Sequence, residues 1–192
     1  MSVSVLLLLL LIGLFVVDAD VAMQKKTEVK ALLELANHHA TFAVNPALKT
    51  EGIIDLVEPE ALARFDRRME ENGGYVRQGS AYVPAGSSLT TDPLPFVRYS
   101  IDFLNWRKDL HLQLRYNGDT LRIERATPGP DRTAGGLLRI TVITEKNETL
   151  ELAPKAMIGP SAVVVAYVDE QPFLPLLPAH AFPVVSVEEL KW

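Results

Sequence analysis

The sequence contains no cysteine, and this absence excludes several classes of protein. Without thiolates the chain cannot carry a disulfide framework, an iron–sulfur cluster, a cysteine-ligated zinc ion or a thioether-attached haem. An electron-carrying haem filament is therefore not expected. The adjacent pair His38-His39 does not replace these sites, because neighbours on a helix point about 100° apart and cannot grip one ion as an i, i+4 pair would. We expect neither a metal nor a cofactor.

Catalytic motifs are also missing from the sequence. It has no phosphate-binding G-x-x-x-x-G-K loop, no dinucleotide-binding G-x-G-x-x-G after a strand, no G-x-S-x-G and no H-E-x-x-H. The remaining histidines, His111 and His180, stand alone in the sequence. We therefore expect that the protein is not an enzyme.

Charged residues are absent from the first 17 residues, MSVSVLLLLLLIGLFVV. A secretory signal peptide normally opens with a basic segment before its apolar run, and here that segment is missing. Val17-Asp18-Ala19 resembles a cleavage site for such a peptide, yet we expect the apolar stretch to stay attached. The chain would then be a mature form whose short leader was removed just before Met1.

The net charge of −5 lies entirely in residues 18–192. Nucleic acids and anionic membrane surfaces are bound mainly through clustered lysine and arginine. The run Arg64, Arg67 and Arg68 is followed directly by Glu70 and Glu71, and it is too short for a nucleic-acid stripe. We expect no nucleic-acid partner.

A single long helix is predicted over about residues 2–44. The apolar stretch continues into a segment in which apolar residues recur at spacings of three, four and seven, and no proline interrupts before Pro46. Such a helix would be roughly 65 Å long, which exceeds any compact domain of this size. Its first half must therefore find apolar partners outside its own subunit, either in lipid or in identical helices.

The rest of the chain predicts a small, mainly antiparallel β-sheet head behind a helical connector. Asn45-Pro46 and Pro59 are typical helix starts, and Asn72-Gly73-Gly74 is a typical helix end. A short strand is predicted at 53–57, and Asn117-Gly118 predicts a hairpin turn. Further strands are predicted near 75–83, 96–104, 109–116, 119–125, 137–144, 148–152 and 162–168, with an exposed loop at 127–136.

The predicted fold class is α+β, with four segments along the chain. The last segment is rich in proline, and Pro172, Pro175 and Pro178 share the three-residue period of a polyproline II helix. It would extend away and lie across a neighbouring head, or else pack on its own sheet. The segments are an apolar-to-amphipathic helix at 1–44, a connector at 45–74, a β-rich head at 75–170 and an extended tail at 171–192.

The charges directly after the apolar stretch need an explanation. If Asp18 or Asp20 is packed among helices, burying a bare carboxylate costs several kcal/mol unless it is paired. Lys25 or Lys26 of a neighbouring, axially shifted subunit would then set the register between subunits. Alternatively, both aspartates mark where the helix leaves the membrane for water.

An apolar half-helix continuing into an amphipathic half, with a β-rich head behind it, resembles the mature subunits of type IV pili and related filaments. Residues 31–52, ALLELANHHATFAVNPALKTEG, with the helix that contains Phe65 and with Asn72-Gly73, also resemble the pseudopilins of tight-adherence systems. The resemblance implies a precursor in the cytoplasmic membrane, a prepilin peptidase, a pilus assembly machinery, and apolar helices bundled in the core of a filament.

One position departs from the type IV pattern. The family commonly carries a glutamate where this chain has Val5, and that glutamate neutralises the N-terminal amine of a neighbouring subunit. No other carboxylate precedes Asp18. Either Asp18 or Asp20 takes part of that role, or the helices pack through apolar contacts alone.

The sequence thus predicts a structural subunit of an extracellular, adhesive, pilus-like filament built from identical copies. Two alternatives remain, namely a membrane-anchored minor pseudopilin or assembly factor, and an exported ligand-binding domain or enzyme. The predicted filament core consists of Leu6, Leu7, Leu8, Leu9, Leu10, Leu11, Ile12, Leu14, Phe15 and Val16.

Overall fold

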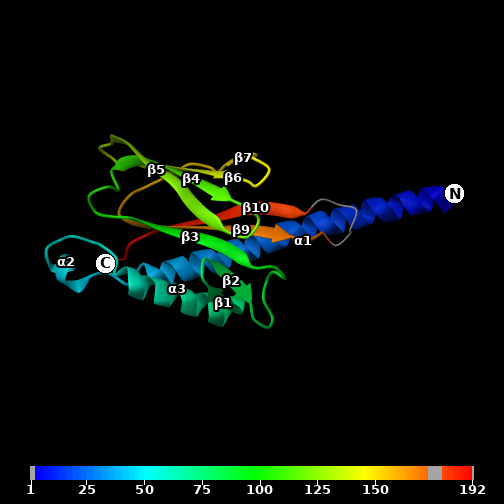
Figure 1. Cartoon of the computed structure of the whole chain (residues 1–192), viewed down its shortest axis with the longest axis horizontal. Helices are drawn as coiled ribbons and strands as arrows, with labels where there is room; N and C mark the ends of the chain where they lie inside the picture. The colour runs from blue at the N-terminus through cyan, green and yellow to red at the C-terminus, as the bar shows by residue number, and fades with distance from the viewer. Residues whose placement is uncertain (1–2, 173–178, 192) are drawn as a thin grey trace.

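The computed structural model describes residues 3–172 and 179–191 as an α+β fold in three layers (Figure 1). Helices lie on one side of a sheet with the strand order β1-β2-β3-β9-β10, and a second sheet with the order β5-β4-β6-β7 covers its other side. The predicted class, a long apolar helix followed by a mainly antiparallel head, is confirmed.

The helices are α1 (Val3–Ala40), α2 (Pro46–Thr50) and α3 (Glu58–Gly73). The strands are β1 (Tyr75–Gln78), β2 (Ala81–Pro84), β3 (Leu94–Ile101), β4 (Lys108–Tyr116), β5 (Leu121–Asp131), β6 (Leu137–Ile143), β7 (Thr149–Glu151), β8 (Lys155–Ala156), β9 (Ser161–Glu170) and β10 (His180–Glu189).

Strand β9 is at the centre of the head. Its neighbours β3 and β10 both pair with it in antiparallel register. Because side chains alternate between the two faces of a strand, Val164, Ala166 and Val168 join the core under the helices, whereas Val163 and Val165 join the core between the sheets. A strand covered on both faces needs a nearly continuous apolar run, which the sequence provides here.

Helix α1 ends at Ala40, four residues earlier than predicted. Val44 instead forms an antiparallel bridge with Leu56, and the Asn45 N–H donates to the carbonyl of Asp55 over 2.9 Å. This bridge is all that remains of the strand predicted at 53–57. The predicted helix end at residue 44 and the predicted strand at 53–57 were both wrong because Val44 meets Leu56, and helical periodicity cannot reveal such a contact.

The strand predicted over 75–83 is a hairpin. Gln78 pairs with Ala81 across a turn of Gly79 and Ser80, and Gly79 has a positive φ of 61°. A glycine at the first turn position was a local signal for this hairpin. The hairpin predicted at Asn117-Gly118 is confirmed, because β4 and β5 pair in antiparallel register across it.

The exposed loop predicted at 127–136 begins later than expected. Strand β5 continues to Asp131, with Thr127 paired to His111 and Pro128 paired to Leu110, and its residues there are exposed as expected. Proline lacks the N–H that a central strand would need, but β5 is the edge strand of its sheet. An edge position therefore tolerates Pro128 and Pro130.

The prediction of an extended C-terminal tail was wrong for residues 180–189. They form β10, which pairs with β9 along its whole length, and Pro183 lies opposite Tyr167. Strand β10 is again an edge strand, so the missing N–H is tolerated. The alternative that the tail packs on its own sheet is confirmed for these residues, while Pro175 and Pro178 lie outside the described residues.

The aromatic cluster under α3 provides a test of this packing. The Phe65 ring is completely buried and lies 5.8 Å from the ring of Tyr82 and 6.2 Å from that of Phe96. We expect Phe65→Ala to lower the free energy of unfolding by about 3–5 kcal/mol, because it leaves a large cavity. Denaturant titration of the full chain in detergent measures this loss.

Leu104→Ala is the matched control, because the Leu104 side chain is 80% exposed. Its expected change is below about 0.5 kcal/mol. Equal losses for the two variants would contradict the assigned core.

Candidate assembly helix and its junction with the head

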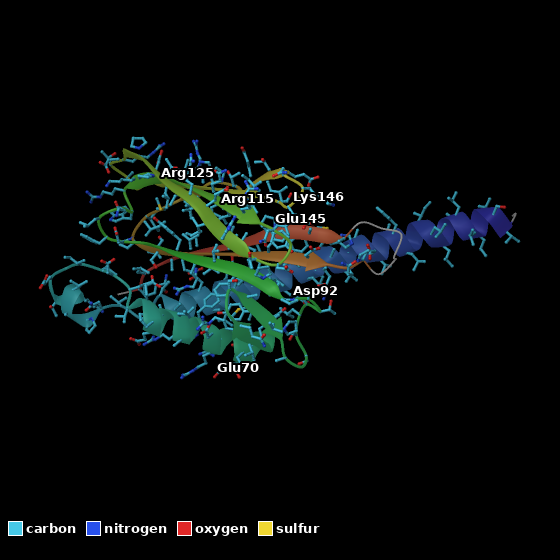
Figure 2. All side chains as sticks on the ribbon, viewed as in Figure 1. Glu70, Asp92, Arg115, Arg125, Glu145 and Lys146 are labelled. Carbon is cyan, nitrogen blue, oxygen red and sulfur yellow. The ribbon has the colours of Figure 1, made fainter. Side chains whose placement is uncertain are left out.

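The first half of α1 projects beyond the head as a single rod (Figure 1). Its side chains radiate on all sides of the helix (Figure 2). Nine of the ten predicted core residues are exposed, and only Leu14 is partly buried. The exposed fractions from Leu6 to Leu11 range from 47% to 66%. A helix that is apolar all round is stable only inside lipid or among other apolar helices.

The second half of α1 packs in the head. Its buried residues Val29, Leu33, Ala36 and Ala40 lie at helical spacing on one face and join the core with α3 and β9. The change from one half to the other falls at Asp18, which is 4% exposed. Asp18 is thus the first fully buried residue along the described part of the helix. That the two aspartates mark the point where the helix leaves the membrane stays a prediction.

Asp18 is paired within its own subunit. The imidazole Nε2 of His180, the first residue of β10, lies 2.6 Å from Oδ2 of Asp18. A buried carboxylate needs such a partner to offset its lost hydration. The sequence could not show this contact, because the two residues are separated by 162 positions.

Two turns further along α1, Lys25 forms an ion pair with Glu170, the last residue of β9. The hydroxyl of Thr91 also donates to the same carboxylate oxygen over 3.2 Å. The Glu170 side chain is 8% exposed and that of Lys25 is 25% exposed, so the pair is largely shielded from water. Lys25 therefore fixes the helix to the end of β9.

The other two predicted register charges lie at the surface. The Lys26 ammonium lies over the ring of Phe182 in β10, 5.3 Å from its centroid. Asp20 is exposed and has no ion-pair partner among the described residues. A role for these charges between subunits stays a prediction, and Asp20 is the residue that could take it without breaking a contact inside the subunit.

A buried amide completes the junction. Asn37 is fully buried, and its Nδ2 donates to the carbonyl of Ala162 over 2.9 Å and to the hydroxyl of Ser186 over 3.1 Å. It therefore connects α1 to both β9 and β10. Sequence reasoning missed Asn37, although a lone amide between the apolar positions Leu33, Ala36 and Ala40 was a usable signal.

A small cavity lies between β3 and the β4–β5 hairpin. It encloses about 220 Å³ and is lined in part by Asp102 and Asp109. Asp102 accepts hydrogen bonds from the Leu104 and Asn105 N–H groups, and Asp109 accepts from the Leu137 N–H and pairs with Arg132. The hydrogen bond from Arg132 has the largest effect on the pKa of Asp109 and lowers it. Partial desolvation of the carboxyl raises this pKa, but the hydrogen bonds from Arg132 and the Leu137 N–H together outweigh it. Both carboxylates thus hold local loop structure.

No metal-binding cluster of three or more His, Asp or Glu side chains occurs in the described part of the chain. The rings of His38 and His39 are 6.3 Å apart at nearly right angles, and His38 Nδ1 lies 3.4 Å from a carboxylate oxygen of Glu188. The two histidines do not converge on a common point.

Comparisons of the chain with protein-family models, with curated proteins and with solved structures found no match. Geometry alone therefore defines the class. The protein is an α+β protein with a β-sheet head and an N-terminal helix that is long and apolar enough to cross a membrane.

The Lys25–Glu170 pair can be tested by removing its cation. In Lys25→Met the Glu170 carboxylate would stay buried without its countercharge. Loss of one partner from a fully buried pair costs roughly 3–5 kcal/mol, and because Lys25 is partly exposed we expect about 2 kcal/mol. The measurement is the free energy of unfolding of the full chain in detergent.

Lys30→Met is the control on the same helix. Lys30 pairs with Glu34 at 3.5 Å with both side chains about half exposed, so a change below about 0.5 kcal/mol is expected. Adding Glu170→Gln to Lys25→Met should restore part of the loss. Indistinguishable stabilities for Lys25→Met and Lys30→Met would show that the pair does not hold the helix.

Proposed function

We propose that this protein is a structural, non-enzymatic subunit of an extracellular filament that resembles a type IV pilus. The observation that carries the proposal is the rod formed by residues 3–17, exposed on every side while the same helix continues into a firmly packed head. Identical subunits would bundle these rods into a core and place the heads outside.

The apolar surface of the rod is large enough to drive assembly. Burying a leucine-sized side chain fully is worth roughly 1.5–3 kcal/mol, so six leucines, even partly buried, supply on the order of 10 kcal/mol per subunit. That amount makes a polymer resistant to dilution. The same rod would reside in the cytoplasmic membrane before assembly, as the pilin resemblance implies.

The junction with the head supports assembly over simple anchoring. A membrane anchor functions at any angle between its helix and its head. In an ordered polymer, by contrast, this angle must be the same in every subunit. The contacts of Asp18, Lys25 and Asn37 with β9 and β10 fix that angle along one face of α1. Apolar exposure and fixed direction together favour a filament.

The length of the rod does not separate the filament from a membrane anchor. From Val3 to Val17 the helix is about 22 Å long at 1.5 Å per residue, and the exposed Val21 and Met23 extend its apolar surface toward the ≈ 30 Å hydrocarbon core of a bilayer. A membrane-anchored minor pseudopilin remains the second candidate, because a short span can be accommodated by local thinning of the bilayer.

Filament formation can be tested by replacing large apolar side chains of the rod with small ones, without adding charge. In Leu7→Ala/Leu10→Ala/Leu14→Ala the three substitutions share one face of the helix and keep it apolar enough to enter a membrane. If the rods bundle, the lost contacts should lower filament yield at least tenfold, since about 1.4 kcal/mol already suffices for that factor. The assay is electron microscopy of material sheared from cells, with mass spectrometry of its N-terminus.

The matched control removes three exposed apolar side chains from outside the rod, in Phe42→Ala/Leu104→Ala/Ile158→Ala. It should leave filament yield unchanged. Wild-type protein that stays in the membrane fraction without forming filaments would reject the filament and favour the anchored pseudopilin.

A further inference from the structure

A groove with excess positive charge lies between α1 and α3. It is lined by His39 of α1 and by Glu60, Ala63, Arg64, Arg67 and Arg68 of α3. Arg64 pairs with Glu60 at 2.6 Å and Arg68 pairs with Glu71 at 3.2 Å, both as exposed pairs along one helix. Arg67 is exposed and has no ion-pair partner among the described residues. The groove therefore holds a cation that nothing within the described chain neutralises.

The electrostatic environment of His39 agrees with this excess. Partial desolvation and then the charges of Arg68, His38 and Arg64 lower the pKa of His39, and the opposing effect of Glu71 is smaller. A histidine surrounded by arginines resists gaining a further positive charge. An anionic group entering the groove would be attracted by the same potential.

A hollow with excess negative charge lies at the end of the second sheet. Its charged lining residues are Glu145, Glu148 and Asp169, with Lys146 as the one cation among the described lining residues. Glu145 and Glu148 are exposed and have no ion-pair partners in the described part of the chain. We call this surface the acidic hollow and the surface between α1 and α3 the basic groove.

Two stacked tyrosines form the floor of the acidic hollow. The ring centroids of Tyr116 and Tyr167 lie 3.9 Å apart, and the Tyr116 hydroxyl, which donates to the Gly118 carbonyl, lies 3.3 Å from a carboxylate oxygen of Asp169. Burial, followed by the charge of Asp169, raises the pKa of both phenols. The hollow thus combines a rigid aromatic floor with carboxylates, and its potential is opposite to that of the basic groove.

The two surfaces lie on opposite sides of the head. Figure 1 shows α3 below the central sheet and the turn between β6 and β7 above it. In Figure 2, Glu145 and Lys146 of that turn and Glu70 of α3 are labelled on these two sides. The turn between β6 and β7 also lies nearer the protruding end of α1 than most of α3 does (Figure 1). One molecule therefore cannot bring its own two surfaces together.

We propose that the basic groove of one subunit receives the exposed turn between β6 and β7, which carries Glu145 and Glu148 at the rim of the acidic hollow, from a second copy of this chain. A contact between two different surfaces is heterologous, and its repetition generates an open helical polymer. This inference rests on the proposed filament, because the bundled rods would bring the heads side by side. Arg67 would face Glu148 or Glu145 of the neighbouring subunit, and the pairing would fix the order and direction of the heads.

Charge reversal tests this pairing. Arg67→Glu and Glu148→Arg each place like charges across the contact, so each should lower filament yield at least fivefold and make assembly less sensitive to added salt. The double variant Arg67→Glu/Glu148→Arg restores opposite charges and should recover part of that loss. The controls Arg125→Glu and Glu51→Arg make the same charge changes at exposed positions outside both surfaces.

Cross-linking provides a readout that does not depend on filament yield. Since the natural chain has no cysteine, Arg67→Cys and Glu148→Cys chains can be mixed at full length in membrane vesicles and treated with a short bismaleimide. The expected product is a heterodimer that exceeds either homodimer severalfold. Arg125→Cys mixed with Glu148→Cys is the control pair and should give no such excess.

The outcomes separate the two proposals. Single reversals without effect, or the absence of a heterodimer excess, would overturn the head contact even where electron microscopy shows filaments. A heterodimer excess in vesicles with no filaments under any condition would support the contact and reject the filament as its setting.

Discussion

A continuous helix cannot fold back on itself, and this constraint organises the whole molecule. The head covers one face of α1 from Asp18 onward, where Val29, Leu33 and Ala36 are buried, whereas residues 3–17 are exposed except for the partly buried Leu14. Roughly half of the apolar surface of the helix must therefore be covered by something outside the subunit. The elements of the head lie along and beyond the second half of α1, and the first half projects away from them (Figure 1).

The polar junction has a different task from the apolar core. Buried charge pairs add little net stability over well-packed apolar residues, because both ions lose their hydration. The Lys25–Glu170 pair and the contact between Asp18 and His180 instead fix direction, since both are satisfied only at one rotation and one axial position of the helix. A small slide of α1 along the sheet would break these contacts.

The sequence predicted the features that depend on local patterns. The long helix follows from an uninterrupted apolar run, the end of α3 from Gly74 in a left-handed conformation, and the β4–β5 turn from Asn117-Gly118. Errors arose where distant segments decide the conformation. Val44 leaves the helix because it meets Leu56, and residues 180–189 become a strand because β9 offers a free edge.

The same division applies to the candidate site. The exposed apolar rod was fully predictable, since composition alone shows that it lacks internal partners. The partners of Asp18 and Lys25 were not, because His180 and Glu170 are separated from them by 162 and 145 positions. A contact between two elements that are distant in the sequence leaves no periodic pattern in a single sequence. The basic groove was visible only as a short arginine run, and its depth depends on His39 from another helix.

The prolines of the edge strands have a consequence for crowded heads. Strands β10 and β5 bound their sheets, and Pro183, Pro128 and Pro130 interrupt the row of N–H donors that an incoming strand would need. At these two edges, heads held at high local concentration would thus touch through side chains without merging their sheets into a continuous ribbon. A head that meets either edge can separate again intact, because no backbone ladder has to be broken there.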